Sequence, residues 1–254
     1  MSTGRTLVCL TFLLATPPLA AFAREATNDS GKVEHLVSGR SVSIGFQDFT
    51  HVISAPARWH GREWGEFGIV SGAVAGSAML LDVPVRNFSQ RNRSRLSNNI
   101  ARDFKQFGSY YPFAIEAGFY FGGEIFRNEN AKACGLDALS AGIISVGLIE
   151  QPVKWLIGRN RPYQNNGRYS FDPFTFDASF PSGHTTHAFL LATVISMHYP
   201  KTWVKVTGYS VATLVAFDRI NDDIHFTSDV ITGAVIGVVV GRAVVFLNRK
   251  LRKL

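Results

Sequence analysis

Cysteine is nearly absent from this chain of 254 residues, which has only Cys9 and Cys134. Cys9 lies in the segment 1–23, which has the pattern of a cleavable signal peptide, so the mature chain would keep a single thiol. One cysteine cannot form an internal disulfide, and export therefore implies no disulfide framework. A metal site built from thiolates is excluded for the same reason.

The sequence also lacks the glycine-rich motifs of nucleotide-binding enzymes, both the P-loop and the dinucleotide fingerprint. It has no internal repeat, low-complexity tract or second domain boundary. Charged residues are sparse at 18%, whereas hydrophobic residues at 46% are enough for a full core. We therefore expect a signal peptide at 1–23, an N-terminal extension at 24–58 and one domain at 59–254.

The predicted signal peptide has three parts. Arg5 gives the basic region, Leu7 to Ala15 form a short apolar run, and Ala21-Phe22-Ala23 is a small-residue cleavage site. An uncleaved anchor is the alternative, but the apolar run is well short of the ~20 residues that a membrane span needs. The pattern predicts export to the periplasm or cell envelope, with the functional site outside the cytoplasm.

Positive charge exceeds negative charge, for a formal net charge of +7. Such an excess attracts nucleic acid, anionic lipid or phosphorylated substrates. An exported protein rarely meets nucleic acid, so we expect phosphorylated lipids, small phosphoesters or a membrane surface as partners, and no nucleic acid.

Apolar segments rich in alanine, glycine and valine alternate with polar loops from Phe67 onward, which predicts an all-α fold. Small residues on several faces permit close helix packing. The stretch from Phe46 to Trp64 is rich in aromatic residues and fits a packed edge helix better than a helix at a membrane interface. We expect a bundle of about six to seven helices, near 66–82, 94–107, 110–127, 134–158, 184–199, 202–218 and 228–248.

Long hydrophobic runs are scarce. Most apolar stretches measure about 12–16 residues between charges, which is shorter than a typical membrane span. The stretch from Val230 to Leu247 approaches that length, but Arg242 interrupts it. The lengths slightly favour a soluble or peripheral bundle, whereas the basic C-terminal tail favours a span with its last end in the cytoplasm.

The first of three polar motifs consists of Lys154 and the dipeptide Arg161-Pro162. Gly158 is a plausible helix C-cap, and Pro162 favours an extended conformation at Arg161. Arginine binds phosphate oxygens in a bidentate manner, whereas lysine acts as a point charge. The alternative is a helix end that carries cations beside its own dipole, and we interpret Arg159 in that way.

The second motif, Pro181-Ser182-Gly183-His184, predicts the start of a helix. Free amides at a helix N-terminus bind anions, and a glycine lets the ligand approach the backbone. His184 would stand beside this site. Taken alone, His184 fits an N-terminal histidine with a solvent partner better.

The third motif contains Arg219, His225 and Asp229. His225 and Asp229 are four residues apart, which places them on one face of a predicted helix. A carboxylate that accepts the proton of one ring nitrogen leaves the other nitrogen free to act as a nucleophile. Taken alone, the pair fits a capping carboxylate with an incidental histidine.

A metal site is the competing interpretation of these histidines. However, the three nearby cations would repel a divalent ion and attract an oxyanion. We therefore expect no metal cofactor.

Together the motifs resemble the signature of the type 2 phosphatidic acid phosphatase and haloperoxidase superfamily. That signature reads Lys-x6-Arg-Pro, Pro-Ser-Gly-His and Ser-Arg-x5-His-x3-Asp, and the chain matches it in order and spacing from Lys154 to Asp229. One position departs from it, because Asp218 stands where the family usually has serine. The added charge would either weaken phosphate affinity or orient Arg219 by pairing with it.

The resemblance implies metal-free hydrolysis in two steps. By similarity, His225 forms a phosphohistidine, Asp229 orients His225, and His184 serves as general acid and then as general base. The phosphate oxygens would be held by Lys154, Arg161, Ser182, Gly183 and Arg219. Vanadate is expected to inhibit such a site by imitating the transition state.

We therefore expect a phosphatase of phosphomonoesters or diphosphates, with a lipid phosphate as the favoured substrate. A soluble acid phosphatase of broad specificity is the nearest alternative. A vanadate-dependent haloperoxidase is a weaker alternative, because those enzymes are much longer, and a non-enzymatic envelope protein with a decayed pocket is the remaining one.

Overall fold

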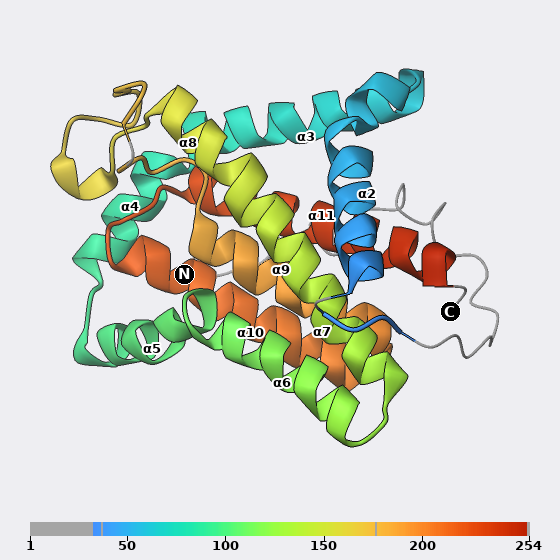
Figure 1. Cartoon of the computed structure of the whole chain (residues 1–254). Coiled ribbons are helices and arrows are strands. Elements are labelled where there is room, and N and C mark those ends of the chain that lie inside the picture. The colour runs from blue at the N-terminus through green and yellow to red at the C-terminus, as the bar shows by residue number, and fades with distance from the viewer. Residues whose placement is uncertain (1–32, 37, 176, 253–254) are drawn as a thin grey trace.

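The computed structural model describes residues 33–252 except residues 37 and 176. The predicted signal peptide lies outside the described residues. Within them the chain is built from α-helices joined by short connections and one long loop (Figure 1). The prediction of an all-α fold is therefore confirmed.

The helices follow one another in a simple order along the chain. The first half contains α2 (Gly39–Ile53), α3 (Gly61–Leu80), α4 (Asp82–Arg91), α5 (Arg95–Lys105) and α6 (Tyr111–Ile125). The second half contains α7 (Glu129–Gly142), the π-helical segment η5 (Ile143–Glu150), α8 (Gln151–Ile157), α9 (Gly183–His198), α10 (Thr202–Asn221) and α11 (Thr227–Arg252).

The predicted helices agree with these elements to within a few residues at most ends. The predicted helix at 134–158 corresponds to α7, η5 and α8, which follow one another without a break. Two helices are absent from the predicted set. The first is α2, which covers only the beginning of the stretch Phe46 to Trp64 where an edge helix was expected. The second is α4, which begins directly after α3 and is bent from it by 50°. The bend falls at Leu81 and Asp82, inside a stretch that the sequence analysis treated as the end of one helix.

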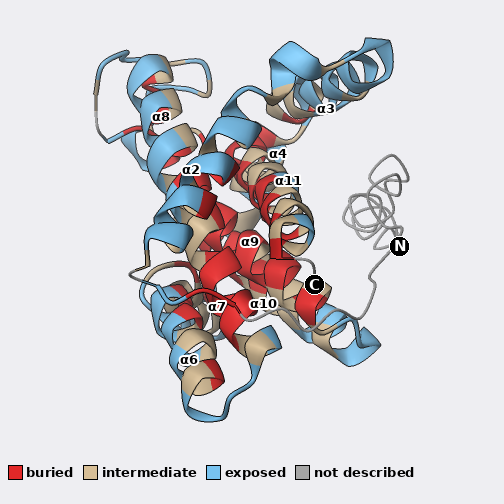
Figure 2. Ribbon diagram, turned by 45° about the vertical axis from the view of Figure 1, so that its right-hand side comes forward, coloured by how far each residue is buried: buried red, intermediate tan, exposed pale blue. Residues whose placement is uncertain are grey.

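Helix α9 lies at the centre of the molecule and packs against α7, α10 and α11 (Figure 2). The main core cluster combines Leu190 and Val194 of α9 with Val240 and Val244 of α11 and with Ala138 of α7. By contrast, most of α3 is exposed and projects from the bundle. The core therefore lies in the second half of the chain, which also contains the three motifs.

Close contact between α9 and α11 depends on glycine. A Cβ atom at Gly237 would lie 2.3 Å from the backbone oxygen of Thr186, and one at Gly233 would lie 2.5 Å from that of Ser182. These distances are shorter than any van der Waals contact, so a larger residue would force the helices apart. The two glycines thus hold the start of α11 against the start of α9.

Among the described residues, two helical stretches are long and apolar enough to cross a membrane, namely Glu129–Ile157 with 29 residues and Thr227–Arg252 with 26. The bent pair α3 and α4 would be a third if it formed one span. The two stretches are longer than the apolar runs of the sequence suggested, because charged residues lie within them instead of ending them. Several of these charges are buried against other helices, including Lys132, Asp137, Glu150 and Arg252. Run length between charges is therefore no argument against a span in this chain.

Candidate active site

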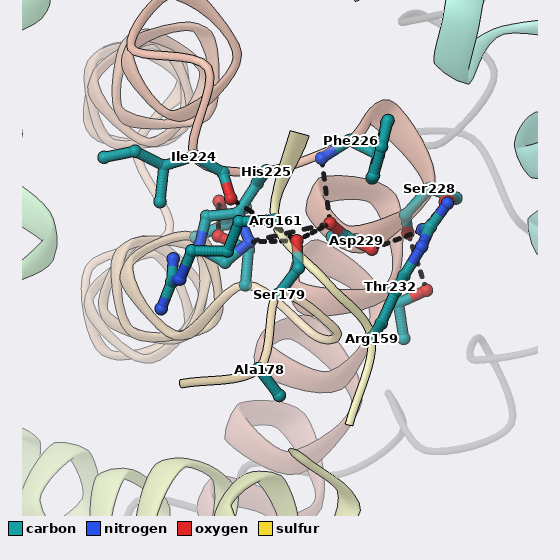
Figure 3. Close-up of polar contacts among 12 residues, drawn as sticks. Arg159, Arg161, Ala178, Ser179, Ile224, His225, Phe226, Ser228, Asp229 and Thr232 are labelled. Carbon is teal, nitrogen blue, oxygen red and sulfur yellow. Dashed lines mark hydrogen bonds and ion pairs between the residues drawn. The ribbon is translucent and has the colours of Figure 1, made fainter. Parts of the chain in front are cut away.

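The three motifs meet where four segments come together. These segments are the end of α8 with the long loop that follows it, the start of α9, the end of α10 and the start of α11 (Figures 1 and 3). Each segment contributes side chains that are remote in sequence from those of the others. The junction is the candidate active site.

Local sequence signals explain how the first motif is placed. Helix α8 ends at Ile157, and Gly158 has the left-handed conformation, with φ 58°, that closes the helix. Arg161 is extended, as expected for a residue before proline. Both predictions are confirmed, and the change of direction at Gly158 brings Arg161 back toward the bundle instead of leaving it two turns along a helix.

Helix α9 begins at Gly183 with Ser182 as its N-cap residue, as predicted. The Ser182 side chain is fully buried, and its hydroxyl contacts that of Thr185 at 2.9 Å. The backbone N–H of Ser182 donates to the backbone oxygen of Asp229 at 3.1 Å. The predicted anion-binding turn is therefore fixed directly to the first turn of α11.

The predicted dyad differs from expectation in one respect. Helix α11 begins at Thr227, so Asp229 lies in its first turn while His225 precedes it in the loop, and the two do not share a helix face. The Asp229 carboxylate caps this loop by accepting the N–H of Phe226 at 2.8 Å. This capped loop, not helical spacing, brings His225 to within 3.7 Å of Asp229, measured from Nδ1 to Oδ2.

Ser179 occupies the space beside the dyad (Figure 3). Its hydroxyl donates to Asp229 Oδ2 in a short hydrogen bond and lies 3.4 Å from His225 Nδ1. Because 3.7 Å is too long for a direct hydrogen bond, the hydroxyl is in position to link the imidazole to the carboxylate. Ser179 was not among the predicted site residues, although it lies only two residues before the second motif.

Arg159 is the most important residue that the sequence analysis misjudged. It is 4% exposed, and its guanidinium donates to Asp229 Oδ1 and to Asp82 Oδ2, each at 2.6 Å. Asp82, the first residue of α4, also accepts from the backbone N–H and the hydroxyl of Ser228, both at 2.8 Å. Arg159 is therefore a buried clamp between two carboxylates, and not a solvated cation at a helix end.

The three predicted phosphate-binding cations line the same junction. Lys154 donates to the backbone oxygen of Ala178 at 3.2 Å, so it lies beneath the loop that carries Ser179. Arg219 is 2% exposed near the end of α10, and its backbone oxygen accepts from the N–H of His225 at 3.2 Å. The side chain of Arg161 lies beside His225 in Figure 3.

Electrostatic coupling shows that these groups are close enough to affect one another. Burial lowers the pKa of His225 to about 4, the charge of Asp229 opposes this shift, and the charges of Lys154 and Arg161 add to it. Burial also lowers the pKa of His184 to about 3, with contributions from Arg219 and His225. Both imidazoles are therefore neutral near pH 7, which leaves His225 with a free lone pair.

The structure thus brings all eight predicted site residues to one junction. These are Lys154, Arg161, Ser182, Gly183, His184, Arg219, His225 and Asp229. Over the described ranges, no group of three or more histidine, cysteine or acidic side chains is arranged to hold a metal ion. The arrangement offers donors and positive charge, which suit an oxyanion.

Comparison with known proteins relates the part of the chain that contains this site to a protein family. The model of the PAP2 superfamily matches residues 136–253, which contain all three motifs. The match is to the type 2 phosphatidic acid phosphatase group that the motifs resemble, and it covers a little less than half of the chain.

Two curated relatives are similar over parts of the chain. The lipid A 1-phosphatase of Porphyromonas gingivalis is 41% identical over 83 residues, which are 30% of this chain and 19% of that protein. The undecaprenyl-diphosphatase of Sulfolobus acidocaldarius is 28% identical over 110 residues, which are 43% of this chain and 52% of that protein. The chain therefore spans about a fifth of the first relative and about half of the second.

A solved structure has the same fold over most of the chain. It is the first transmembrane PAP2-type phosphatidylglycerolphosphate phosphatase from Bacillus subtilis, with 21% identity and a TM-score of 0.51. The match covers 84% of this chain and 98% of that one. The likeness includes helices that precede the region of the family match.

Proposed function

We propose that this protein is a metal-independent phosphatase that removes a phosphomonoester or diphosphate group from a lipid through a phosphohistidine intermediate. One observation carries the proposal. The neutral, buried imidazole of His225 has Nδ1 beside Ser179 and Asp229, while its Nε2 has no hydrogen-bond partner among the described residues. The charges of Lys154 and Arg161 act on this ring, and the charge of Arg219 acts on the neighbouring His184.

In the first step, the Nε2 lone pair attacks phosphorus, the N–P bond forms and the bond from phosphorus to the ester oxygen breaks. The Nδ1 proton is held toward Ser179 and Asp229, which stabilises the positive charge that develops on the ring. Lys154, Arg161, Arg219 and the amides at the start of α9 stabilise the equatorial phosphate oxygens.

His184 supplies the proton for the leaving oxygen. Its pKa is low in the free protein because it is buried and cations surround it. A bound phosphate dianion offsets those cations and raises the proton affinity of the imidazole. Substrate binding and protonation of His184 therefore support each other.

In the second step, the now neutral His184 accepts a proton from water, and the water oxygen attacks phosphorus. The N–P bond breaks, the electron pair returns to His225, and inorganic phosphate leaves. Both histidines then have the protonation state of the enzyme–substrate complex, and His184 gives its proton to solvent as phosphate leaves.

A lipid substrate is favoured by the surface of the molecule and by its relatives. Large apolar side chains are highly exposed, among them Ile69, Leu80, Phe126 and Trp203. Two helical stretches are long enough for a membrane span. The matched relatives are named for lipid A and undecaprenyl diphosphate. We infer a membrane-associated, exported enzyme of the cell envelope whose active site faces away from the cytoplasm.

The charge along α11 supports that orientation. The site lies at the N-terminal end of α11, whereas Arg249 and Lys250 lie at the other end. Basic residues favour the cytoplasmic end of a span.

The proposal is tested with the full chain purified in detergent. We expect phosphate release from lipid A, polyprenyl diphosphate or a phosphatidate-type lipid to exceed release from a small aryl phosphate. Chelators should leave the rate unchanged, and vanadate should inhibit it. Preference for the aryl phosphate would indicate an acid phosphatase of broad specificity instead. Peroxide-dependent halide oxidation with added vanadate, without phosphatase activity, would indicate a haloperoxidase.

A further inference from the structure

Each of the three cations in the proposed phosphate site already has a carboxylate partner in the chain. Lys154 Nζ lies 3.3 Å from Glu150 Oε1, Arg161 Nε lies 2.7 Å from Asp177 Oδ1, and Arg219 Nε lies 2.7 Å from Asp218 Oδ2. A phosphate that binds here competes with these carboxylates for the same cations. The cost of that competition depends on how each carboxylate is held.

The partner of Arg219 is held most firmly. The Asp177 side chain is 63% exposed and lies in the long loop, so it can turn into water when a ligand arrives. Asp218 is 0% exposed, and its Oδ2 accepts from both Nε and Nη2 of Arg219. The other oxygen, Oδ1, is buried and has no hydrogen-bond partner within the described part of the chain.

Because Asp218 is buried and Oδ1 has no partner among the described residues, its environment differs strongly in energy between the ionised and the protonated carboxyl. An ionised carboxylate with one unsatisfied oxygen is costly, and it repels a phosphate that approaches Arg219. A protonated carboxyl has no net charge and can donate a hydrogen bond. Protonation would thus release Arg219 for the ligand and remove the repulsion at once.

We propose that Asp218, at the position where the family signature has serine, sets the affinity of this site for phosphate and makes that affinity increase as the pH falls. Ionised Asp218 competes with phosphate for Arg219, whereas protonated Asp218 does not. This inference rests on the proposed function, since it concerns the phosphate that the enzyme would bind.

Charges from every neighbouring element act on this pair. Arg219 lies on the same helix as Asp218, and Asp222 directly follows that helix as its C-cap residue. Lys105 acts on Asp218 from α5, and His184 on α9 is coupled to Arg219 and Lys105. Asp222 is in turn 3.7 Å from Arg93. Burial outweighs the neighbouring cations and raises the pKa of Asp218 to about 6, so the carboxyl changes its charge near neutrality.

The test measures equilibrium binding of inorganic sulfate to the full chain in detergent. Sulfate resembles phosphate, and its charge is constant across the range used, so the ligand does not titrate. We expect Asp218→Ser and Asp218→Asn to bind sulfate about tenfold more tightly than the unmodified protein at about pH 7.5, the gain of roughly one charge-assisted hydrogen bond. At about pH 5, where Asp218 is protonated, the difference should vanish.

A matched control is Asp222→Asn, which removes a nearby carboxylate that does not contact Arg219. Because Asp222 acts on the pair only through its charge, its removal should change sulfate binding much less than the Asp218 variants do at about pH 7.5. Weaker sulfate binding by both Asp218 variants at the higher pH would overturn the inference, because it would mean that Asp218 helps by orienting Arg219. Equal binding would overturn it as well.

Binding is measured without turnover, so this inference and the proposed function can fail separately. If sulfate binding follows the expected pattern but no lipid phosphate is hydrolysed, the proposed function fails and the anion site stands. If hydrolysis is observed while both Asp218 variants bind sulfate like the unmodified protein, only the role of Asp218 is wrong.

Discussion

Two buried histidine–aspartate pairs lie toward opposite ends of α11. Near its start, His225 Nδ1 is 3.7 Å from Asp229, with the Ser179 hydroxyl beside both. Near its other end, His198 Nε2 contacts Asp137 directly at 2.9 Å. Judged by distance alone, the second pair is the better candidate for a catalytic dyad.

The difference lies in the second ring nitrogen. His198 Nδ1 contacts the side-chain oxygen of Asn130 at 3.0 Å, so neither of its nitrogens is available to a substrate. Asp137 is further occupied by Arg252 and Asn248. This network joins α7, α9 and α11 and leaves no lone pair for chemistry.

At the other pair, His225 keeps Nε2 free of partners among the described residues, and the charges of Lys154 and Arg161 act on its ring. The proposed catalytic pair is therefore distinguished by the nitrogen that stays unoccupied, and not by the closeness of the histidine to an acid. The two pairs provide matched positions for mutation.

The largest effect is expected from the two histidines. His225→Ala should lower the rate of hydrolysis by at least about 10⁴-fold, because it removes the nucleophile. His198→Ala should cost about 1–3 kcal/mol of stability through its lost hydrogen bonds but leave kcat per folded molecule unchanged. Both are checked by phosphate release together with thermal unfolding in detergent. If His225→Ala hydrolyses lipid phosphate at the normal rate, the assigned nucleophile is wrong.

A smaller effect is expected from the clamp behind Asp229. Asp82→Asn and Arg159→Lys should each lower kcat about 10- to 100-fold, because a weakened charge-assisted bond lets Asp229 move. KM should change little, since neither side chain is among the proposed phosphate ligands. Rates measured over a range of substrate concentrations up to saturation would give kcat and KM separately. A larger rise in KM than fall in kcat would mean that the clamp shapes substrate binding instead.

The smallest effect concerns stability as a function of pH. The pKa of His225 is about 4 in the folded chain against 6.5 for an ordinary imidazole, so the unfolded chain binds the proton first as the pH falls. The cost of His225 to the free energy of unfolding therefore grows as the pH falls from about 6.5 to about 4, and it is absent above that range. Thermal unfolding of His225→Gln should show a shallower loss of stability over this range. An unchanged slope would contradict a neutral, buried His225.

Much of the fold could be predicted because its signals are local. Gly158 marks the end of α8, and the N-cap residue Ser182 marks the start of α9. Each of these signals acts over a few residues. The break between α3 and α4 also has a local signal, which the predicted helices did not use: Pro84 lies in the first turn of α4 and cannot donate a backbone hydrogen bond to the preceding helix. The sequence did not show that the break also places the buried carboxylate of Asp82 against partners in α11 and in the long loop.

The residues of the candidate site also fall into a group that could be predicted from the sequence and a group that could not. The motif residues were predictable because their type and spacing indicate a phosphate site. Ser179 and Arg159 were not, because serine and arginine are common in loops and at helix ends, and only their partners give them a role. Arg159 is 77 positions from Asp82 and 70 from Asp229, far beyond the reach of helical spacing.

The sequence by itself determined the helical segments, their caps and the set of groups that could bind an oxyanion, since these depend on residues within a turn or two of each other. Only the tertiary structure decided which histidine keeps a free nitrogen among the described residues and which arginine holds the carboxylate behind it. Those outcomes depend on contacts between helices, where burial removes water and leaves each charge dependent on the neighbour that packing provides.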